Sequence, residues 1–347
     1  MNNLAEFKRR ICNMVAEAES IGITTHLNPD GDGYCAALAL QKIISAMGKK
    51  SVIWMDEDNL KRFDFLLHPA LSLASQNPEV QIFYPDIPLS RQKTDLLFVV
   101  DCNSYERIGM RRSLLDNSGF IALLDHHILE NHPIQADLAF IDTAYVSVGA
   151  IIHELFQEEI ASLPSADKVY VANCLYTTIL NDTNNFANAN TNAEVFELAA
   201  ELSRLGIKPN LLYKEFFLNH AAEEMRYVGQ TLSTIALHHD RRILSMYSTQ
   251  EMSLENQVDP ESVMNITRWV QGVAGIDAIV YLLETSENTF KISLRSINLD
   301  VNAIAVKYGG GGHRQASGCT ILGTREEVLS KLLLDFQQAI TDYDQNR

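Results

Sequence analysis

Basic residues are scarce in this chain of 347 residues. Lysine and arginine total 28 against 44 aspartates and glutamates, so the formal net charge is −16 at pH 7. A protein that grips long nucleic acid along its phosphates normally carries a basic face. We therefore expect any basic patch to be small and local, and no binding of long duplex nucleic acid.

Long apolar runs and paired cysteines are also lacking. No stretch approaches the roughly 18 uncharged apolar residues of a membrane span, and the start, MNNLAEFKRRIC, lacks an apolar core followed by a small-residue cleavage site. It predicts a helix instead, with Leu4, Phe7, Ile11 and Val15 at helical spacing. The five cysteines have no CxxC spacing. We expect a reduced, cytoplasmic protein with no membrane partner.

What remains is typical of a packed globular protein, with 46% hydrophobic and 21% charged residues. The length exceeds the roughly 100–200 residues of one domain, so we expect two. Apolar strand candidates at 20–26, 51–55, 94–101 and 119–127 alternate with helix candidates at 36–47, 147–159 and 166–181. Runs that are apolar on both faces suit a buried parallel sheet. We predict an α/β fold with a doubly wound, mostly parallel sheet over residues 1–190.

The rest of the chain predicts a connector and a second domain. Residues 190–240 look helical throughout, with a break between Gly206 and Pro209, and we assign 191–224 to a helical connector. Strand candidates at 242–248, 276–284 and 289–295 and helix candidates at 260–271, 300–308 and 325–341 predict a smaller α/β domain over 225–347.

Histidines and aspartates recur where the predicted strands end. The residues are His26, Asp30 and Asp32 in THLNPDGDG, Asp101 in VVDCN, and Asp125, His126 and His127 in LLDHH, while Asp182 in ILNDTNNF ends a predicted helix. Ligands of open α/β sheets bind beyond the carboxyl ends of the strands. Each motif alone has a structural interpretation, as a turn, a helix cap or a core histidine. Their joint occurrence favours one shared site.

Electrostatics indicates what that site holds. If Asp30, Asp32, Asp101 and Asp182 meet at about 5 Å, each pair repels by roughly 3 kcal/mol at an effective dielectric near 20. The total, on the order of 20 kcal/mol, exceeds the stability of a typical domain, so either protons or cations must compensate. Carboxylates with imidazoles suit two divalent cations, Mn²⁺ before Mg²⁺, Co²⁺ or Zn²⁺. Such metal pairs activate water for phosphoester hydrolysis.

A second motif is YGGGGHRQASG at 308–318. Without Cβ atoms, backbone N–H groups can approach a phosphate or a base closely, and His313 and Arg314 add donors. A flexible tight loop is the alternative interpretation. The motif lacks the Gly-Lys-Ser/Thr of a Walker loop.

These motifs, in this order, resemble a known family. HLNPDGDG, VVDCN, LLDHH and NDTNNF are similar to the four motifs of the DHH phosphoesterases, and YGGGGHRQASG, preceded by SLRS at 293–296, is similar to the DHHA1 domain. The resemblance covers nearly the whole chain. We expect neither the extra domains of RecJ-type exonucleases nor the spanning helices of membrane cyclic-di-AMP phosphodiesterases. Pyrophosphatases of the superfamily lack the GGGH signature. It thus resembles the stand-alone group of bifunctional oligoribonucleases and phosphatases of 3′-phosphoadenosine 5′-phosphate (pAp).

The resemblance implies roles for individual residues. One metal ion would be held by His26, Asp30 and Asp101, and a second by Asp32, Asp101, His126 and Asp182, with Asp101 bridging. Asp125 would orient a histidine and His127 would face the substrate phosphate, so the residues with catalytic roles are Asp101, Asp125 and His127. The substrate would be bound by Arg107, Arg295, Gly310, Gly311, Gly312, His313 and Arg314, with the DHHA1 domain across a cleft from the metals.

The expected activity is a Mn²⁺-dependent phosphoesterase, both exoribonuclease and 3′(2′),5′-bisphosphate nucleotidase. It would cleave short RNA or DNA oligonucleotides to mononucleotides and dephosphorylate pAp, by attack of a metal-bridging hydroxide. One alternative is a soluble phosphodiesterase for cyclic-di-AMP or linear pApA. Another, from a different class, is a non-catalytic nucleotide-binding sensor. A homodimer is an expectation from the resemblance alone.

Overall fold

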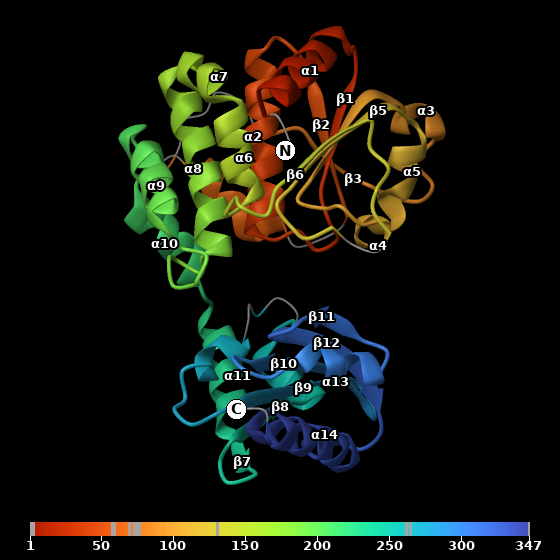
Figure 1. Cartoon of the computed structure of the whole chain (residues 1–347), viewed down its shortest axis with the longest axis vertical. Helices are drawn as coiled ribbons and strands as arrows, with labels where there is room; N and C mark the ends of the chain where they lie inside the picture. Colours follow the sequence, from red (N-terminus) through yellow and green to blue (C-terminus); the bar gives the residue numbers. More distant parts are fainter. Residues whose placement is uncertain are drawn as a thin grey trace. The chain divides into compact units, whose positions relative to one another are not determined.

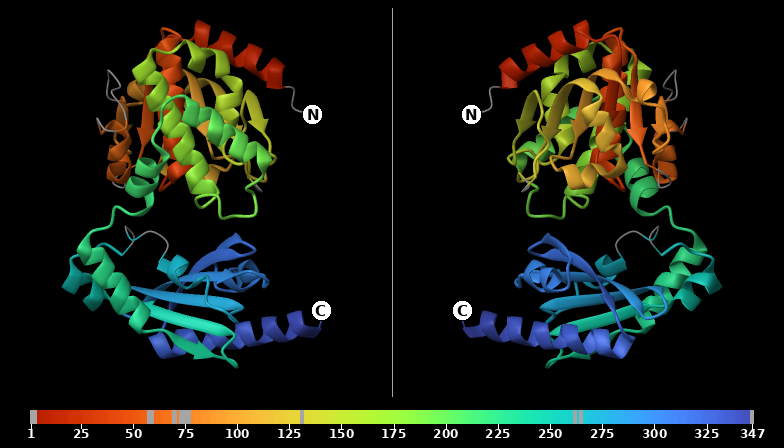
Figure 2. Two further views of the ribbon diagram at one scale, coloured as in Figure 1. Left: turned by 90° about the vertical axis from the view of Figure 1, so that its left-hand side faces the viewer. Right: turned by 90° about the vertical axis from the view of Figure 1, so that its right-hand side faces the viewer.

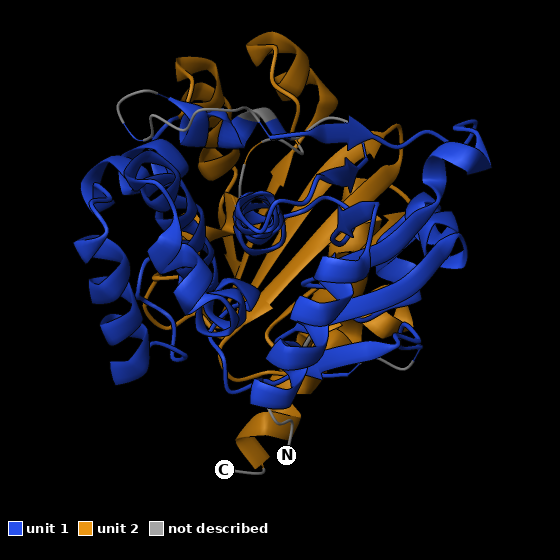
Figure 3. Ribbon diagram, turned by 90° about the horizontal axis from the view of Figure 1, so that it is seen from above, with its two compact units in different colours: residues 1–219 blue, residues 220–347 orange. Residues whose placement is uncertain are grey.

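The computed structural model describes residues 4–56, 60–68, 71, 78–129, 132–260, 263 and 266–345. It divides into two compact units, residues 1–219 and 220–347 (Figure 3). Both units combine a six-stranded sheet with helices, which confirms the predicted α/β fold class. Each unit has its own apolar clusters and is a structural body in its own right.

The first unit is built on a six-stranded sheet in the order β3-β2-β1-β4-β5-β6, in which every pair of neighbours is parallel. The strands are β1 Ile21–Thr24, β2 Ser51–Met55, β3 Val80–Ile82, β4 Thr94–Val100, β5 Ser118–Asp125 and β6 Leu138–Ile141. This is the doubly wound order, in which the chain reverses direction across the sheet between β1 and β4. The sequence analysis did not identify β3 and β6, which are three and four residues long.

Helices cover both faces of this sheet (Figures 1 and 2). On one face lie α1 Leu4–Glu17, α2 Gly31–Ala46, α6 Val148–Leu155 and α8 Ser165–Asp182; on the other lie α4 Tyr105–Ile108 and α5 Arg112–Asp116. The remaining elements are η1 Leu60–Leu67, α3 Leu89–Gln92, η2 Gly109–Arg111, α7 Gln157–Ser162, α9 Ala193–Arg204 and α10 Pro209–Phe217. In β4, Phe98 packs into one cluster and Leu97 and Val99 into the other, as an apolar run buried on both faces requires.

Helix α2 begins earlier than the sequence analysis predicts. It starts at Gly31 rather than near residue 36, because the Asp30 carboxylate accepts hydrogen bonds from the backbone N–H groups of Asp32 (2.9 Å) and Gly33 (3.2 Å). These two bonds cap the helix. The turn-like sequence NPDGDG is therefore a helix start, and Asp32 lies in the first turn of α2.

The second unit carries a mixed sheet in the order β11-β12-β10-β9-β8-β7. Its strands are β7 Ala236–His238, β8 Ile243–Ser248, β9 Ala278–Ser286, β10 Thr289–Ser296, β11 Gly311–His313 and β12 Ala316–Leu322. Its helices are α11 Ala222–Ser233, α12 Gln250–Asn256, η3 Ile266–Val270, α13 Val301–Lys307 and α14 Arg325–Gln345. Only β8 and β9 pair in parallel.

Three interpretations of this part of the chain need correction. The stretch 190–240 is not helical throughout, since residues 236–238 form the edge strand β7. Of the predicted helix 260–271, only residues 266–270 are described as helical, in the short 3₁₀ helix η3, and residues 261, 262, 264 and 265 lie outside the described residues. The oligoglycine segment is not an open loop, because residues 311–313 pair with β12 as the strand β11.

Gly149 sets how closely α6 and α8 approach. A Cβ atom at Gly149 would lie 2.1 Å from Thr178 Oγ1, and Thr178 is fully buried. We expect Gly149→Ala to lower the free energy of unfolding by about 2 kcal/mol, because the added methyl group overpacks a filled interface. Urea unfolding followed by circular dichroism measures the change.

Gly229→Ala is the matched control for this substitution. Gly229 lies on α11, and nothing stands within 4 Å of its added Cβ atom. There alanine is expected to stabilise the helix by roughly 0.5–1 kcal/mol, since glycine loses more backbone entropy on folding. Equal effects of the two substitutions would contradict the packing argument.

Candidate functional site

The side chains singled out at the strand ends of the first unit converge. His26 follows β1, Asp101 follows β4, and Asp125 ends β5 with His126 and His127 behind it. Asp30 and Asp32 lie at the start of α2, and Asp182 is the last residue of α8. Parallel strands place their carboxyl ends at one edge of the sheet. The candidate site is therefore assembled from three strands and the ends of two helices.

The cluster contains three sets of residues, and within each set the potential ligand atoms lie within 4.8 Å of one another. The sets are His26, Asp30 and Asp101; Asp32, His126 and Asp182; and Asp101, His126 and His127. His26 Nε2 is 3.4 Å from Asp101 Oδ2, and His126 Nε2 is 3.2 Å from Asp182 Oδ2 and 3.4 Å from Asp32 Oδ2. All six residues expected as metal ligands thus lie together, with Asp101 in two of the sets.

Unsatisfied atoms show what this cluster fits. Four buried atoms, His26 Nε2, His126 Nε2, Asp101 Oδ1 and Asp182 Oδ2, have no hydrogen-bond partner. Buried polar atoms are normally hydrogen-bonded because leaving them unpaired is costly. Divalent cations would satisfy all four, and carboxylate oxygens with imidazole nitrogens form a donor set that such cations accept.

Two histidine rings of the cluster are oriented so that they could bind a cation through Nε2. His26 Nδ1 lies 2.7 Å from the carbonyl oxygen of Leu27, and His126 Nδ1 lies 3.2 Å from that of Tyr145. A carbonyl oxygen can only accept, so each Nδ1 carries the proton and donates it. A ring that has lost the proton of Nε2 then presents the lone pair of that atom to the cluster, which is the form that binds a metal ion.

The excess of carboxylates shifts the ionisation of the cluster. Burial and the neighbouring aspartates raise the pKa of Asp32, and burial raises the pKa of Asp182. Burial opposes a charge on His26, yet the Asp101 and Asp30 carboxylates raise its pKa to about 9. Without cations, Asp32 and Asp182 therefore hold their protons more strongly than an isolated carboxyl group does, because a charge there would be buried beside other carboxylates.

Asp32 is anchored from an element that the sequence analysis did not connect with the site. Its Oδ2 accepts from the backbone N–H of Val148 (2.7 Å) and its Oδ1 from that of Gly149 (3.1 Å), both in the first turn of α6. The positive end of a helix dipole favours a carboxylate there. No pattern around VSVG in the sequence signals this partnership.

Asp125 is fully buried and organises the segment that carries the two histidines. Its Oδ1 accepts from the backbone N–H groups of His126 (2.7 Å) and His127 (3.0 Å) and lies 2.9 Å from His127 Nδ1. Burial opposes the charge on Asp125, but its contact with His127 keeps its pKa below the usual value. Asp125 thereby fixes the orientation of the partly exposed His127 ring.

Asn103 holds Asp125 from the other side. Its Nδ2 donates to Asp125 Oδ2 (2.7 Å) and to the carbonyl oxygen of Ile128 (3.2 Å). The sequence analysis quoted this residue within VVDCN but gave it no role. Its position two residues after Asp101 is the signal that could have identified it.

We expect Asn103→Ala to lower kcat by about 10- to 100-fold, the usual cost of losing a group that orients the ligands of a metal site. The Asp125 carboxylate would lose the hydrogen bond from the Asn103 amide, and the segment 126–128 would lose the hydrogen bond to the Ile128 carbonyl oxygen. Steady-state kinetics measures the change, with Asn117→Ala as control. Asn117 lies at the end of α5, and within the described part of the chain its side chain bonds only the Ser113 carbonyl oxygen. A kcat equal to wild type would contradict the positioning role.

The remaining residues singled out in the sequence lie in separate places. Arg107 is in α4, and its carbonyl oxygen accepts from the backbone N–H of Leu27, the residue after His26. In the second unit, Arg295 lies on β10 opposite Ala316 of β12. Its guanidinium donates to the carbonyl oxygen of Leu294 and, among the described residues, has no carboxylate partner. Burial lowers its pKa.

The oligoglycine strand packs tightly on its neighbour. A Cβ atom at Gly310 would lie 2.1 Å from the carbonyl oxygen of Gly318, and Gly312 has φ +141°. Only glycine fits these positions. Gly311 and Gly312 pair with Gly318 and Ser317, and Arg314 is exposed in the turn that follows. The side chain of His313 lies outside what the structure describes.

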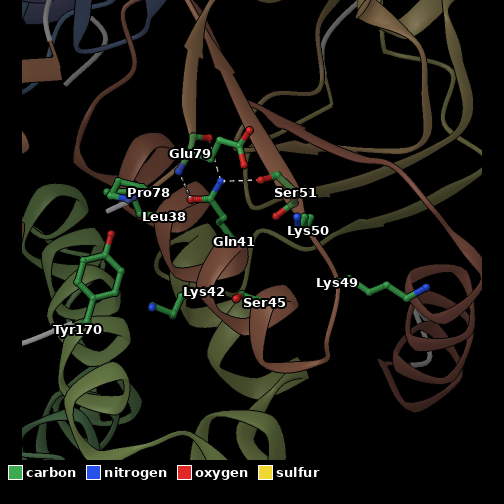
Figure 4. A pocket seen from close by; sticks show the side chains of 10 residues that line it. All are labelled: Leu38, Gln41, Lys42, Ser45, Lys49, Lys50, Ser51, Pro78, Glu79 and Tyr170. Carbon is green, nitrogen blue, oxygen red and sulfur yellow. Dashed lines mark hydrogen bonds between the residues drawn. The ribbon is translucent and has the colours of Figure 1, made fainter. Parts of the chain in front are cut away.

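A separate cavity of about 200 Å³ lies at the amino end of β2, on the side of the first sheet away from the candidate site (Figure 4). Its cationic side chains include Lys42, which is 3.0 Å from Asp167, and Lys49, which donates to two backbone carbonyl oxygens. The Gln41 amide is also engaged, with Ser51 and Glu79. Most polar groups of this cavity thus serve the fold itself.

The described helices include none with the length and apolar character of a membrane span.

Comparison with known proteins agrees with this architecture. Residues 20–179 match the model of the DHH family N-terminal domain, and residues 246–342 match the DHHA1 domain. The chain is 27% identical to the bifunctional oligoribonuclease and PAP phosphatase NrnA of Thermus thermophilus over 304 residues, covering 87% of this chain and 84% of that protein. It is 27% identical to the protein of the same name from Mycoplasma genitalium, covering 93% and 94%.

A solved structure shares the fold. The exopolyphosphatase-related protein of Bacteroides fragilis superposes with a TM-score of 0.84 at 21% identity, covering 98% of this chain and 96% of that one.

Proposed function

Because this chain belongs to the DHH phosphoesterase family, with a DHH domain followed by a DHHA1 domain, we propose that it is a Mn²⁺-dependent oligoribonuclease and pAp phosphatase. The observation that carries the proposal is the set of four unsatisfied buried ligand atoms at the carboxyl edge of the first sheet. Relatives named as bifunctional oligoribonucleases and PAP phosphatases support the choice of substrate. Their matches extend over both units of the chain.

His26, Asp30 and Asp101 would hold one cation and Asp32, His126 and Asp182 the other, with Asp101 shared. Bound cations would supply charge to neutralise the phosphoryl oxygens and to activate a water molecule. His127, held by Asp125, keeps its Nε2 side available for a phosphoryl oxygen. In the cation-free protein, Asp101 and Asp125 outweigh burial and raise the pKa of His127 to about 10. A protonated ring would donate a charged hydrogen bond to that oxygen.

We assign recognition of a substrate phosphate in the second unit to Arg295, His313, Arg314 and the backbone of Gly310, Gly311 and Gly312. The guanidinium of Arg295, which has no carboxylate partner among the described residues, suits a phosphate, which its planar fork can bind through two hydrogen bonds. The strand β11 lies at the edge of its sheet, so some of its backbone N–H groups are not used in pairing with β12. Arg107 is a further candidate from the first unit.

The deciding experiment is a time course on end-labelled RNAs of 2 to 24 nucleotides, with Mn²⁺ and with chelator. We expect rapid conversion of the shortest RNAs to mononucleotides in Mn²⁺, release of phosphate from pAp, and no turnover in chelator. Parallel series in Mg²⁺, Co²⁺ and Zn²⁺ identify the preferred cation.

Two results would redirect the assignment. Faster hydrolysis of cyclic-di-AMP or pApA than of pAp and short RNA would make the protein a dinucleotide phosphodiesterase. Tight binding of pAp without turnover in any divalent cation would make it a nucleotide sensor.

A further inference from the structure

We propose that Phe186 and Phe196 form a nucleobase-stacking subsite next to the candidate metal centre. The inference deepens the proposed function, because it specifies how a nucleotide is held beside the cations. It concerns two residues to which neither the metal chemistry nor the phosphate contacts give a role.

The two rings form a preassembled platform. Their centroids are 5.3 Å apart and their planes differ by 14°, which is a stacked arrangement. Phe186 is supported from the interior by Tyr176, whose centroid is 6.1 Å away and whose side chain is buried. Phe196 is 56% exposed. An exposed ring already held in a stack offers a flat surface to a base at little cost in side-chain entropy.

The platform is connected directly to a candidate metal ligand. Phe186 follows Asp182 by four residues, and the loop between α8 and α9 is tied back to Asp182 by two amides. Asn188 Nδ2 and Asn190 Nδ2 donate to the backbone carbonyl oxygen of Asp182, at 2.9 and 3.2 Å. Phe196 lies in the opening part of α9, the helix that this loop leads into. The loop that carries Phe186 and leads to Phe196 is therefore tied to the end of α8, where Asp182 would bind a cation.

The composition of the loop between α8 and α9 favours a nucleotide as the ligand of this subsite. Residues 183–193, TNNFANANTNA, contain no charged side chain in a chain of net charge −16, and five of the eleven are asparagines. The side chains of Asn184 and Asn185 have no hydrogen-bond partner among the described residues. Aromatic rings that stack bases, beside amides that bond base edges, are the usual means of recognising single-stranded nucleotides. The absence of carboxylates from this loop also avoids repulsion of the phosphates.

The test compares Phe196→Ala with two controls. Phe196→Tyr keeps a stacking ring, and Phe120→Ala removes an equally exposed phenylalanine (55%) from the amino end of β5, at the opposite edge of the same sheet. We expect Phe196→Ala to raise KM for a dinucleotide about tenfold with kcat nearly unchanged, because one base stack is lost. Both controls should stay within twofold of wild type. An abasic dinucleotide should show the same KM with wild type and Phe196→Ala.

A binding measurement separates this inference from the proposed activity. A dinucleotide with 2-aminopurine and a non-hydrolysable methylene linkage reports stacking by fluorescence quenching, with no turnover involved. Loss of quenching in Phe196→Ala but not in Phe120→Ala supports the subsite even if no hydrolysis is found. Equal quenching by both variants, or an equal rise in KM for the abasic substrate, would overturn the subsite and leave the proposed phosphoesterase activity intact.

Discussion

Replacing Asp101 with asparagine is expected to reduce cation-dependent hydrolysis by at least about 10³-fold. Even groups that only orient metal ligands cost 10- to 100-fold when removed, and Asp101 belongs to two of the three candidate ligand sets. Its carboxylate lies 3.4 Å from His26 Nε2 and 3.2 Å from His127 Nδ1. An amide in its place keeps the shape but removes the negative charge that the two cations would share.

Asparagine is also the substitution that the backbone tolerates best. Asp101 has φ +57°, in the left-handed region, where asparagine and aspartate are the most readily accommodated residues after glycine. The variant should therefore keep its far-ultraviolet circular dichroism. Saturating Mn²⁺ should raise the Tm of the wild-type protein, as for any ligand that binds only the folded state. This increase should be smaller or absent in the variant.

Asp86→Asn supplies the matched control for Asp101→Asn, because it makes the same charge change at an exposed loop position. It should retain wild-type activity and the full Tm increase with Mn²⁺. If Asp101→Asn hydrolysed dinucleotides at near the wild-type rate in Mn²⁺, the assignment of the shared ligand would be wrong.

Arg111→Met is expected to destabilise the first unit by about 3–5 kcal/mol, the usual consequence of removing one partner of a buried ion pair. The Arg111 side chain is fully buried, and Nη2 lies 2.8 Å from Asp56 Oδ2. Nη1 also donates to the carbonyl oxygen of Trp54 (3.0 Å), at the end of β2. Methionine fills much of the same volume, and the Trp54 carbonyl oxygen would still accept from Thr24 Oγ1 (3.0 Å), so the loss comes chiefly from the uncompensated Asp56 carboxylate.

Urea unfolding of the full chain measures this loss as a shift of the transition midpoint. The double variant Arg111→Met with Asp56→Leu should recover part of the stability, since it removes the stranded charge. Arg9→Met breaks an exposed pair between neighbouring turns of α1 and should leave the midpoint unchanged. If Arg111→Met behaved like Arg9→Met, the buried pair would contribute nothing measurable.

Much of the first unit could be predicted from local patterns. Strands such as 94–101 and 119–127 are nearly continuous apolar runs, and a run of that kind has few alternatives to a strand covered on both faces. Short strands escaped prediction, because three or four residues such as 80–82 carry too little periodicity to identify. The start of α2 was also not predicted, because the residue types that cap a helix are the same types that favour a turn.

Sequence by itself determined which of the candidate ligands lie at which strand ends, since the direction of a parallel strand decides the side of the sheet at which His26, Asp101 and His126 emerge. Only the tertiary structure decided which groups hold them: Val148 and Gly149 on Asp32, Asn103 on Asp125, and the Leu27 and Tyr145 carbonyl oxygens on the histidines. The stack of Phe186 on Phe196 is of the same kind. The reason is physical: strand direction follows from the local chain, whereas a hydrogen bond or a ring stack depends on distances that packing of remote segments sets.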